Sequence, residues 1–127
     1  MSKASSTSPL PINAAARPAG SGAPTLWSPN TDVYLCEAGA VIKVEVAGVK
    51  KEDLEITADG PRLTITGVRR DECRHGSCNF QAMEIHYGAF ESVVELPAAF
   101  DLSQARASYQ NGFLRVDVPA KTPAAKA

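Results

Sequence analysis

Two cysteines and a histidine stand close together in the segment Cys73-Arg-His75-Gly-Ser-Cys78. Their side chains could ligate a zinc ion, or the two thiols could form a regulatory disulfide. Zinc would need a fourth ligand, for which His86 is the nearest candidate, and the spacing matches no strong zinc pattern. We favour ordinary loop residues here and predict neither a metal nor a cofactor, while a redox role for Cys73 and Cys78 stays open.

Catalytic chemistry has equally little support in the sequence. Cys78 and His86 could form a nucleophile pair, but neither an oxyanion donor nor an orienting acid is identifiable. Three neighbouring carboxylates, Glu52, Asp53 and Glu55, are more typical of a solvated corner than of an acid–base pair. The chain also lacks a nucleophile elbow, a phosphate-binding glycine loop and an H-E-x-x-H motif. We therefore expect a protein that is not an enzyme.

Composition narrows the class of protein further. The chain has 127 residues, a length that predicts one domain. Its formal net charge is -1, so it lacks the positive charge that would attract nucleic acid. No apolar run approaches the roughly 18 residues of a membrane span. Lys3 is not followed by the apolar stretch of a secretory signal, so three cysteines indicate a reducing cytoplasm. Cys36, beside the first strand, is predicted to be a small buried apolar residue.

The elements that position these residues are predicted to be short strands. Residues 41–46 alternate, with Ile42, Val44 and Val46 on one face. Asn111 and Gly112 supply the positive φ angles of a tight hairpin turn. Further strands are predicted at residues 54–56, 63–66, 90–96, 107–109 and 113–118, with a connector at 100–105. This pattern predicts an all-β fold, an antiparallel β-sandwich of seven or eight strands, with a core that includes Val44, Ile65 and Leu114.

Composition also divides the chain into three parts. Residues 1–27 are predicted to be a flexible N-terminal arm, 28–119 the β-sandwich domain, and 120–127 a short polar tail. The interval from Gly67 to Gly88 is a long loop, of the kind that is normally functional or carries its own element. Residues 80–87 could form a short strand there that pairs with another subunit, through the candidates Phe80, Met83, Ile85 and Tyr87.

Six short motifs follow one another in an informative order. They are Pro29-Asn-Thr-Asp32-Val-Tyr34, Ala47-Gly48-Val49-Lys-Lys-Glu52-Asp53, Leu63-Thr-Ile65-Thr-Gly67-Val-Arg69, Tyr87-Gly88-Ala-Phe90, Leu96-Pro97 and Ala107-Ser-Tyr-Gln-Asn111-Gly112-Phe-Leu114. Each motif alone is weak. Together, over about 90 residues, they resemble the α-crystallin domain of the small heat-shock proteins.

The resemblance implies an immunoglobulin-like sandwich that forms dimers by exchanging the strand on its long loop. It also implies a groove between two edge strands, one with Leu54 and Ile56 and one with Ala107 and Tyr109. That groove takes an I-x-I/V motif from a neighbour's C-terminal tail. The implied function is an ATP-independent holdase, which binds unfolding client proteins under stress and prevents their aggregation. The arm would add the apolar surface of Leu26 and Trp27.

The chain departs from the family pattern at two places that matter for assembly. The tail after Pro119 contains no I-x-I/V motif, which argues against tail-driven shells. Ser92 stands where an interface arginine is expected, so the charge pairing across a dimer is weakened. In the arm, however, Leu10-Pro11-Ile12 has the same apolar-x-apolar pattern. We hypothesise that Leu10 and Ile12 dock in the groove of their own or a neighbouring subunit.

Two alternatives to the holdase come from other classes of protein. A β-sandwich can also serve as an adaptor or cochaperone module that binds one folded partner. A weaker alternative is a redox enzyme that uses the thiols of the long loop. A holdase should protect several unrelated clients, an adaptor should bind one partner, and a redox enzyme should turn over a peroxide.

Overall fold

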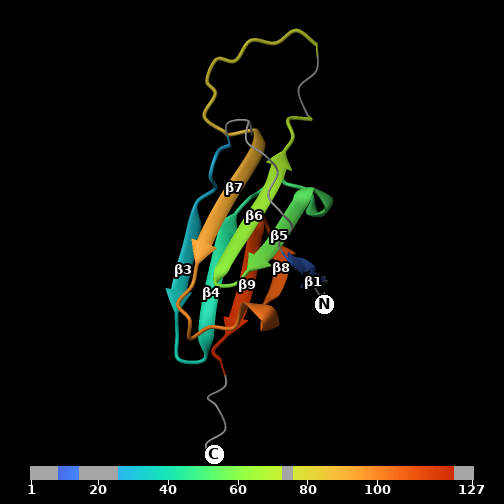
Figure 1. Ribbon diagram of the computed structural model, residues 1–127. Coiled ribbons are helices and arrows are strands. Elements are labelled where there is room, and N and C mark those ends of the chain that lie inside the picture. The colour runs from blue at the N-terminus through green and yellow to red at the C-terminus, as the bar shows by residue number, and fades with distance from the viewer. Residues whose placement is uncertain (1–8, 15–25, 73–75, 122–127) are drawn as a thin grey trace, which may run out of the picture.

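Two β-sheets pack face to face in the computed structural model, which describes residues 9–14, 26–72 and 76–121 (Figure 1). The strands are β1 (Pro9–Leu10), β2 (Ile12–Ala14), β3 (Thr31–Leu35), β4 (Gly39–Glu45), β5 (Leu54–Asp59), β6 (Arg62–Arg69), β7 (Gly88–Glu95), β8 (Arg106–Gln110) and β9 (Phe113–Pro119). Two short 3-10 helices, η1 (Lys51–Asp53) and η2 (Leu102–Gln104), lie in the connections. The predicted all-β sandwich is confirmed.

The order of the strands gives the sandwich two sides at which both sheets end. One sheet has the order β1-β8-β9-β4-β3, and the other has the order β2-β5-β6-β7. The edges β3 and β7 therefore lie on one side, and the short strands β1 and β2 lie on the other (Figure 1). One pair breaks the predicted antiparallel pattern, because β2 runs parallel to β5.

The core consists of the inward-facing residues of both sheets. Val44, Ile65 and Leu114 are all fully buried, as their positions in the alternating strands predict. Burying an aliphatic side chain of this size stabilises a fold by about 1.5–3 kcal/mol. Alternation thus places the core between the two sheets, which leaves the strand edges as the parts of the sandwich open to partners.

The predicted hairpin turn joins β8 to β9. Asn111 has a φ of 55° and Gly112 a φ of 82°, the left-handed conformations that a two-residue hairpin turn requires. Gly112 has a second role, because a Cβ at this position would lie 3.1 Å from the Cα of Ala47. The turn therefore fixes the register of β8, the strand that forms one edge of the groove described below.

The long loop differs from its prediction. β6 does not stop at Gly67 but runs on to Arg69, and the described part of the following loop, residues 70–72 and 76–87, forms no strand. β6 continues through position 67 because this residue has no side chain. The Phe90 ring occupies the space that a side chain would need, and a Cβ there would lie 2.5 Å from it. A lone strand on a loop has no ladder to join within one copy of the chain.

The prediction that Cys36 is buried is wrong, because its side chain is exposed. The backbone of Cys36 exchanges two hydrogen bonds with Gly39, at N···O distances of 2.8 and 3.3 Å. Cys36 therefore closes the hairpin between β3 and β4 at the border of the sheet, where no second layer covers it. Alternation along a strand predicts the face of a residue but not whether that face is covered.

Candidate functional site: the edge groove

Residues 9–14 close the side of the sandwich between β5 and β8, and we call this segment the clip. Its first part, β1, pairs antiparallel with β8, with Leu10 opposite Ala107. Its second part, β2, pairs parallel with β5, with Ile12 opposite Ile56. The clip therefore bridges the two sheets within one chain, and Pro11 lies at the crossing between β1 and β2.

Apolar contacts hold the clip as well as backbone pairing. Leu10 is only 9% exposed and belongs to the hydrophobic core, and Ile12 is partly buried against that core. Ala107 and Ile56, on the two edges, are 3% and 1% exposed. The structure thus brings together four of the residues that the sequence singled out, from the arm and from both edges of the groove.

An open cavity of about 690 Å³ adjoins the clip and was not foreseen from the sequence. Leu10 and Ile12 form part of its lining, and Phe100, Leu102 and Ala105 from the connector around η2 form another part. Asp101 caps η2 by accepting a hydrogen bond from the backbone N–H of Ser103. The Asp-x-Ser spacing is a recognisable helix-cap signal, but nothing in it announces a cavity.

Tyr109 and Leu54, also predicted to line the groove, have other surroundings. The Tyr109 hydroxyl lies 2.7 Å from the carbonyl oxygen of Val49 and 3.0 Å from that of Val46, and donates to them. Burial raises the pKa of Tyr109, so the phenol stays protonated and remains a donor at neutral pH. Tyr109 fixes β8 to the end of β4 and positions the edge, while Leu54 packs partly buried against the core.

Trp27 is anchored on the opposite side, where the sequence predicted the end of a flexible arm. Its backbone N–H donates to Ala89, its carbonyl accepts from Glu91, and its indole Nε1 donates to the carbonyl of Gly88 at 3.1 Å. The indole also stacks on His86, with ring centroids 5.4 Å apart. Trp27 therefore covers part of the β7 edge, and the preceding Leu26 is only partly exposed.

Cationic side chains fix both ends of the long loop. Arg69 places its guanidinium 4.7 Å from the Trp27 ring centre and donates to the carbonyl of His86. Arg70 forms two hydrogen bonds with Asp53, at 2.9 and 3.0 Å. These bonds and the charge of Arg70 lower the pKa of Asp53, so this carboxylate of the predicted solvated corner is ion-paired. Glu52 and Glu55 are exposed, as predicted for a solvated corner, whereas Asp53 belongs to the root of the loop.

The outer edge of β3 is open in the described chain. Hydrogen bonds join Glu45 to Asn30 and Cys36 to Gly39, so by antiparallel alternation the N–H and C=O groups of Thr31, Val33 and Leu35 point away from β4. Val33 and Leu35 also carry exposed apolar side chains. This edge can accept another strand.

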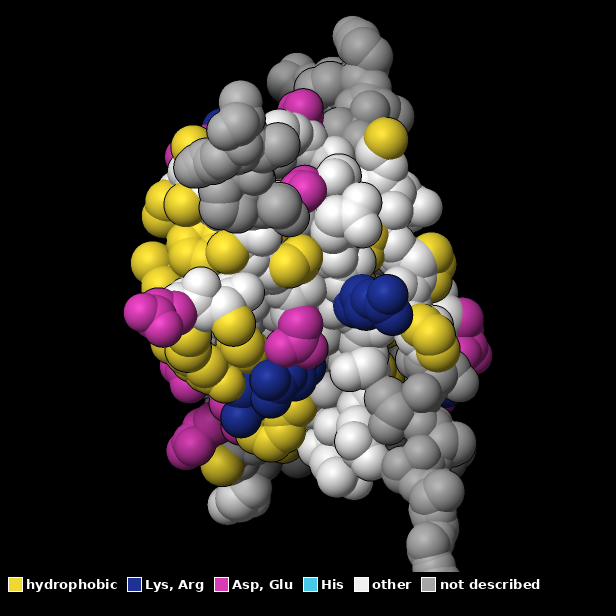
Figure 2. All heavy atoms as spheres, turned by 90° about the horizontal axis from the view of Figure 1, so that it is seen from below, with side chains coloured by type: hydrophobic (Ala, Val, Ile, Leu, Met, Phe, Trp, Pro, Cys, Tyr) yellow, Lys and Arg dark blue, Asp and Glu magenta, His cyan; other side chains and the backbone are white. Residues whose placement is uncertain are grey.

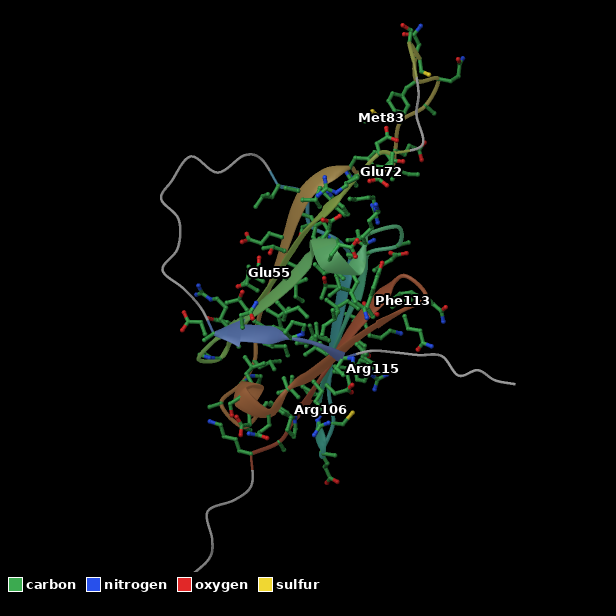
Figure 3. The ribbon with its side chains drawn as sticks, turned by 90° about the vertical axis from the view of Figure 1, so that its right-hand side faces the viewer. Glu55, Glu72, Met83, Arg106, Phe113 and Arg115 are labelled. Carbon is green, nitrogen blue, oxygen red and sulfur yellow. The ribbon has the colours of Figure 1, made fainter. Side chains whose placement is uncertain are left out.

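Several predicted dimer-loop residues are exposed apolar side chains on the loop. Phe80 is 46%, Met83 61% and Ile85 58% exposed, whereas Tyr87 is partly buried near the loop's root. Figure 3 shows Met83 on the part of the loop that projects beyond the sandwich, past Glu72. Within one copy of the chain, the apolar side chains of the loop and those of the β3 edge are therefore both exposed.

Ser92 lies inward on β7 and is 5% exposed, at the position where the family pattern suggested an interface arginine. Its hydroxyl lies 2.9 Å from that of Thr31, and the two form a hydrogen bond between the sheets. No sequence pattern predicts this pair, because the serine and the threonine lie 61 positions apart. A buried serine at this position stabilises the fold of one subunit but cannot form a charge pair with a second subunit.

Two of the candidate zinc residues, Cys73 and His75, lie outside the described residues. Cys78 is exposed, and His86 stacks on Trp27. Within the described ranges, no group of three or more metal-ligating side chains is arranged around a common point. The same part of the chain contains no helix with the length and apolarity to span a membrane.

Comparison with known proteins supplies the family. The family model described as Hsp20/alpha crystallin family matches residues 34–127. The chain belongs to this family. Small heat shock protein C2 of Rickettsia felis is 30% identical to it over 93 residues, which cover 73% of this chain. The solved structure of heat shock protein 16.0 from Schizosaccharomyces pombe is 31% identical and superposes with a TM-score of 0.69, covering 83% of this chain and 84% of that one.

A solved small heat-shock protein from Xylella fastidiosa superposes with a TM-score of 0.72 at 25% identity, covering 81% of this chain and 94% of that one. The present chain spans about 60% of the length of the curated Rickettsia felis relative. Membership of the family confirms the predicted α-crystallin resemblance and supports a chaperone role for this small heat-shock protein. The family is generally non-enzymatic.

Proposed function

We propose that this small heat-shock protein is an ATP-independent holdase whose clip gives way to an extended segment of an unfolding client. The observation that carries the proposal is that a segment of six residues, 9–14, completes two strand edges at once. An unfolding protein exposes the same kind of segment, an extended backbone with alternating apolar side chains. Client and clip would therefore compete for the edges of β5 and β8.

Exchange of this kind requires that the docked and undocked clip be close in free energy. Fixing the backbone costs about 1–2 kcal/mol for each residue that becomes ordered. Opposing this cost are the burial of Leu10, worth about 1.5–3 kcal/mol, the partial burial of Ile12 and the backbone pairing, each bond of which contributes about 0.5–1.5 kcal/mol. Because these contributions largely offset one another, heat or a competing strand can shift the balance.

We further propose that the partner for the other side of the sandwich is a second copy of this chain. Among the described residues, the backbone groups of Val33 and Leu35 on the outer side of β3 have no strand partner, and the loop offers the apolar side chains Met83 and Ile85. Each set has apolar residues two positions apart, which places them on one face of an extended strand. The loop of one copy can therefore add a strand to the β3 edge of the other.

Suppression of aggregation tests the holdase directly. Two unrelated clients are heated with the protein, with and without ATP, while light scattering is recorded. We expect suppression at near-stoichiometric ratios for both clients and no effect of ATP. A folded sample that protects neither client would contradict the proposal, and protection of a single client would favour the adaptor alternative.

We place this activity in the cytoplasm, on the grounds of cysteine usage.

The role of the clip is tested by truncation. A variant lacking residues 1–20 loses the clip, and a matched variant lacking residues 1–7 retains it. We expect the first to capture a fluorescent extended client peptide more tightly, and the second to match the full chain. A synthetic peptide with the sequence of residues 7–15 should displace the client peptide from the longer truncation. Equal capture by both truncations would show that the clip does not guard the client site.

A further inference from the structure

We propose that Met83 is a site of oxidation by hydroperoxides, and that its sulfoxide weakens the association of two copies of this chain. The inference rests on the self-association proposed above and adds its regulation. It starts from a side chain whose chemistry the chaperone role does not use. Methionine is apolar as a thioether and polar as a sulfoxide, so one oxygen atom changes what its surface can bury.

Exposure makes Met83 accessible to a hydroperoxide. Met83 is 61% exposed, the highest value among the large hydrophobic residues that the structure describes. In Figure 3 it lies on the loop well away from the two sheets. The chain contains two methionines, and the other is Met1. Among the described residues, methionine oxidation is therefore confined to the thioether of Met83.

The position of Met83 on the loop explains why its oxidation would affect self-association. Met83 and Ile85 are two residues apart, so an extended backbone turns both side chains to the same face. Val33 and Leu35 have the same spacing on the open edge of β3. Met83 thus provides half of the apolar pair that the loop brings to a second copy. On such an extended backbone Glu84, which lies between them in sequence, would turn to the opposite face and would not replace the lost apolar contact.

The chemical step is a two-electron oxygen transfer. The Met83 Sδ lone pair attacks the distal oxygen of a hydroperoxide, an S–O bond forms and the O–O bond breaks. The leaving alkoxide or hydroxide takes up the peroxide proton and departs as alcohol or water. Sulfur is oxidised by two electrons and the peroxide is reduced by two. A methionine sulfoxide reductase reverses the step, so the change can act as a switch.

The sulfoxide oxygen must lose its hydration when the loop packs on an apolar edge. The side chains of Val33 and Leu35 carry no hydrogen-bond donor, and their outward backbone N–H groups would pair with the backbone of the added strand. We expect oxidation to raise the dissociation constant of the self-association by about tenfold or more, the scale on which an unpaired buried polar group acts. Linkage requires the converse effect: association should slow the oxidation of Met83, which is a second and independent readout.

The experiment uses the full chain with its three cysteines replaced by serine, since thiols would consume the peroxide. This background must associate as the unaltered chain does. It is compared with the same chain carrying Met83→Leu, which keeps the apolar volume and cannot form a sulfoxide. Both are treated with hydrogen peroxide, mapped by peptide mass spectrometry and analysed by sedimentation over a range of concentrations.

The expected result is weaker association of the oxidised Met83 chain, recovery after treatment with methionine sulfoxide reductase, and no response from Met83→Leu. Oxidation of Met83 should also be slower at concentrations where the chain is associated. An untreated chain that stays monomeric at every concentration would refute the proposed self-association itself. An untreated dimer whose dissociation constant is unchanged by full oxidation of Met83 would refute this inference alone.

Discussion

Replacing Leu10 by alanine tests whether the clip is a detachable segment or an obligatory part of the core. Leu10 is 9% exposed, and truncating a buried leucine to alanine costs about 2–5 kcal/mol. That cost falls on the clip's docking equilibrium, which is itself a difference of a few kcal/mol between offsetting terms. We therefore expect Leu10→Ala to undock the clip while the sandwich stays folded, so that the loss in unfolding free energy is capped at the clip's own docking free energy.

Amide hydrogen exchange together with urea unfolding measures both effects. In Leu10→Ala, exchange at the β8 and β5 amides that face the clip should rise to the level of the variant lacking residues 1–20. The urea midpoint should match that truncated variant. Leu114→Ala is the matched control, because Leu114 is fully buried between the sheets and should lose about 2–5 kcal/mol of global stability. A Leu10→Ala chain with fully protected edges, or with the global loss of Leu114→Ala, would refute the reasoning.

Three further changes test the residues that position the edges and the loop. Tyr109→Phe should lower the unfolding free energy by about 1 kcal/mol, measured in urea, because two carbonyls lose their donor; an unchanged midpoint would contradict this. Ser92→Ala should cost about 0.5–1.5 kcal/mol in urea, because the bond between the sheets is lost while the Thr31 hydroxyl keeps only its donation to the carbonyl of Pro29; a Ser92→Ala midpoint equal to that of the unaltered chain would count against the bond. Arg70 lowers the pKa of Asp53, so the pair is intact above the ordinary carboxyl pKa and is lost as the pH falls through the lowered value. Limited proteolysis of the loop should therefore accelerate only in strong acid, and Asp53→Asn should show the fast cleavage already at pH 7.

Most of the sandwich could be predicted because its signals are local. The alternation of Ile42, Val44 and Val46 specifies a face, and Asn111-Gly112 specifies a turn, without reference to the rest of the chain. Both predictions are confirmed in the folded chain. A row of alternating apolar residues is buried only when it faces the core, and few residue types adopt a positive φ. The groove candidates Ile56 and Ala107 likewise lie on the predicted edges.

The features that escaped prediction depend on what covers an edge. Cys36 looked like a core residue, but it closes a hairpin at the border of the sheet and is exposed. Trp27 looked like the end of a flexible arm, yet hydrogen bonds and a stack on His86 fix it on β7. The parallel pairing of β2 with β5 was also absent from the prediction. Periodicity assigns a side chain to a face, whereas neighbours in space decide whether that face is open.

The anchoring of Trp27 has a consequence for spectroscopy. It is the single tryptophan of the chain, and its indole bonds to Gly88, stacks on His86 and lies under the guanidinium of Arg69. Its emission therefore reports chiefly on the root of the long loop and on the contact of that root with Phe90 at the border of the core. Fluorescence and far-ultraviolet circular dichroism would give coincident melting curves only if that root and the sandwich open together. An earlier fluorescence transition would mark the loop as a separate cooperative unit, with its own melting temperature inside a folded domain.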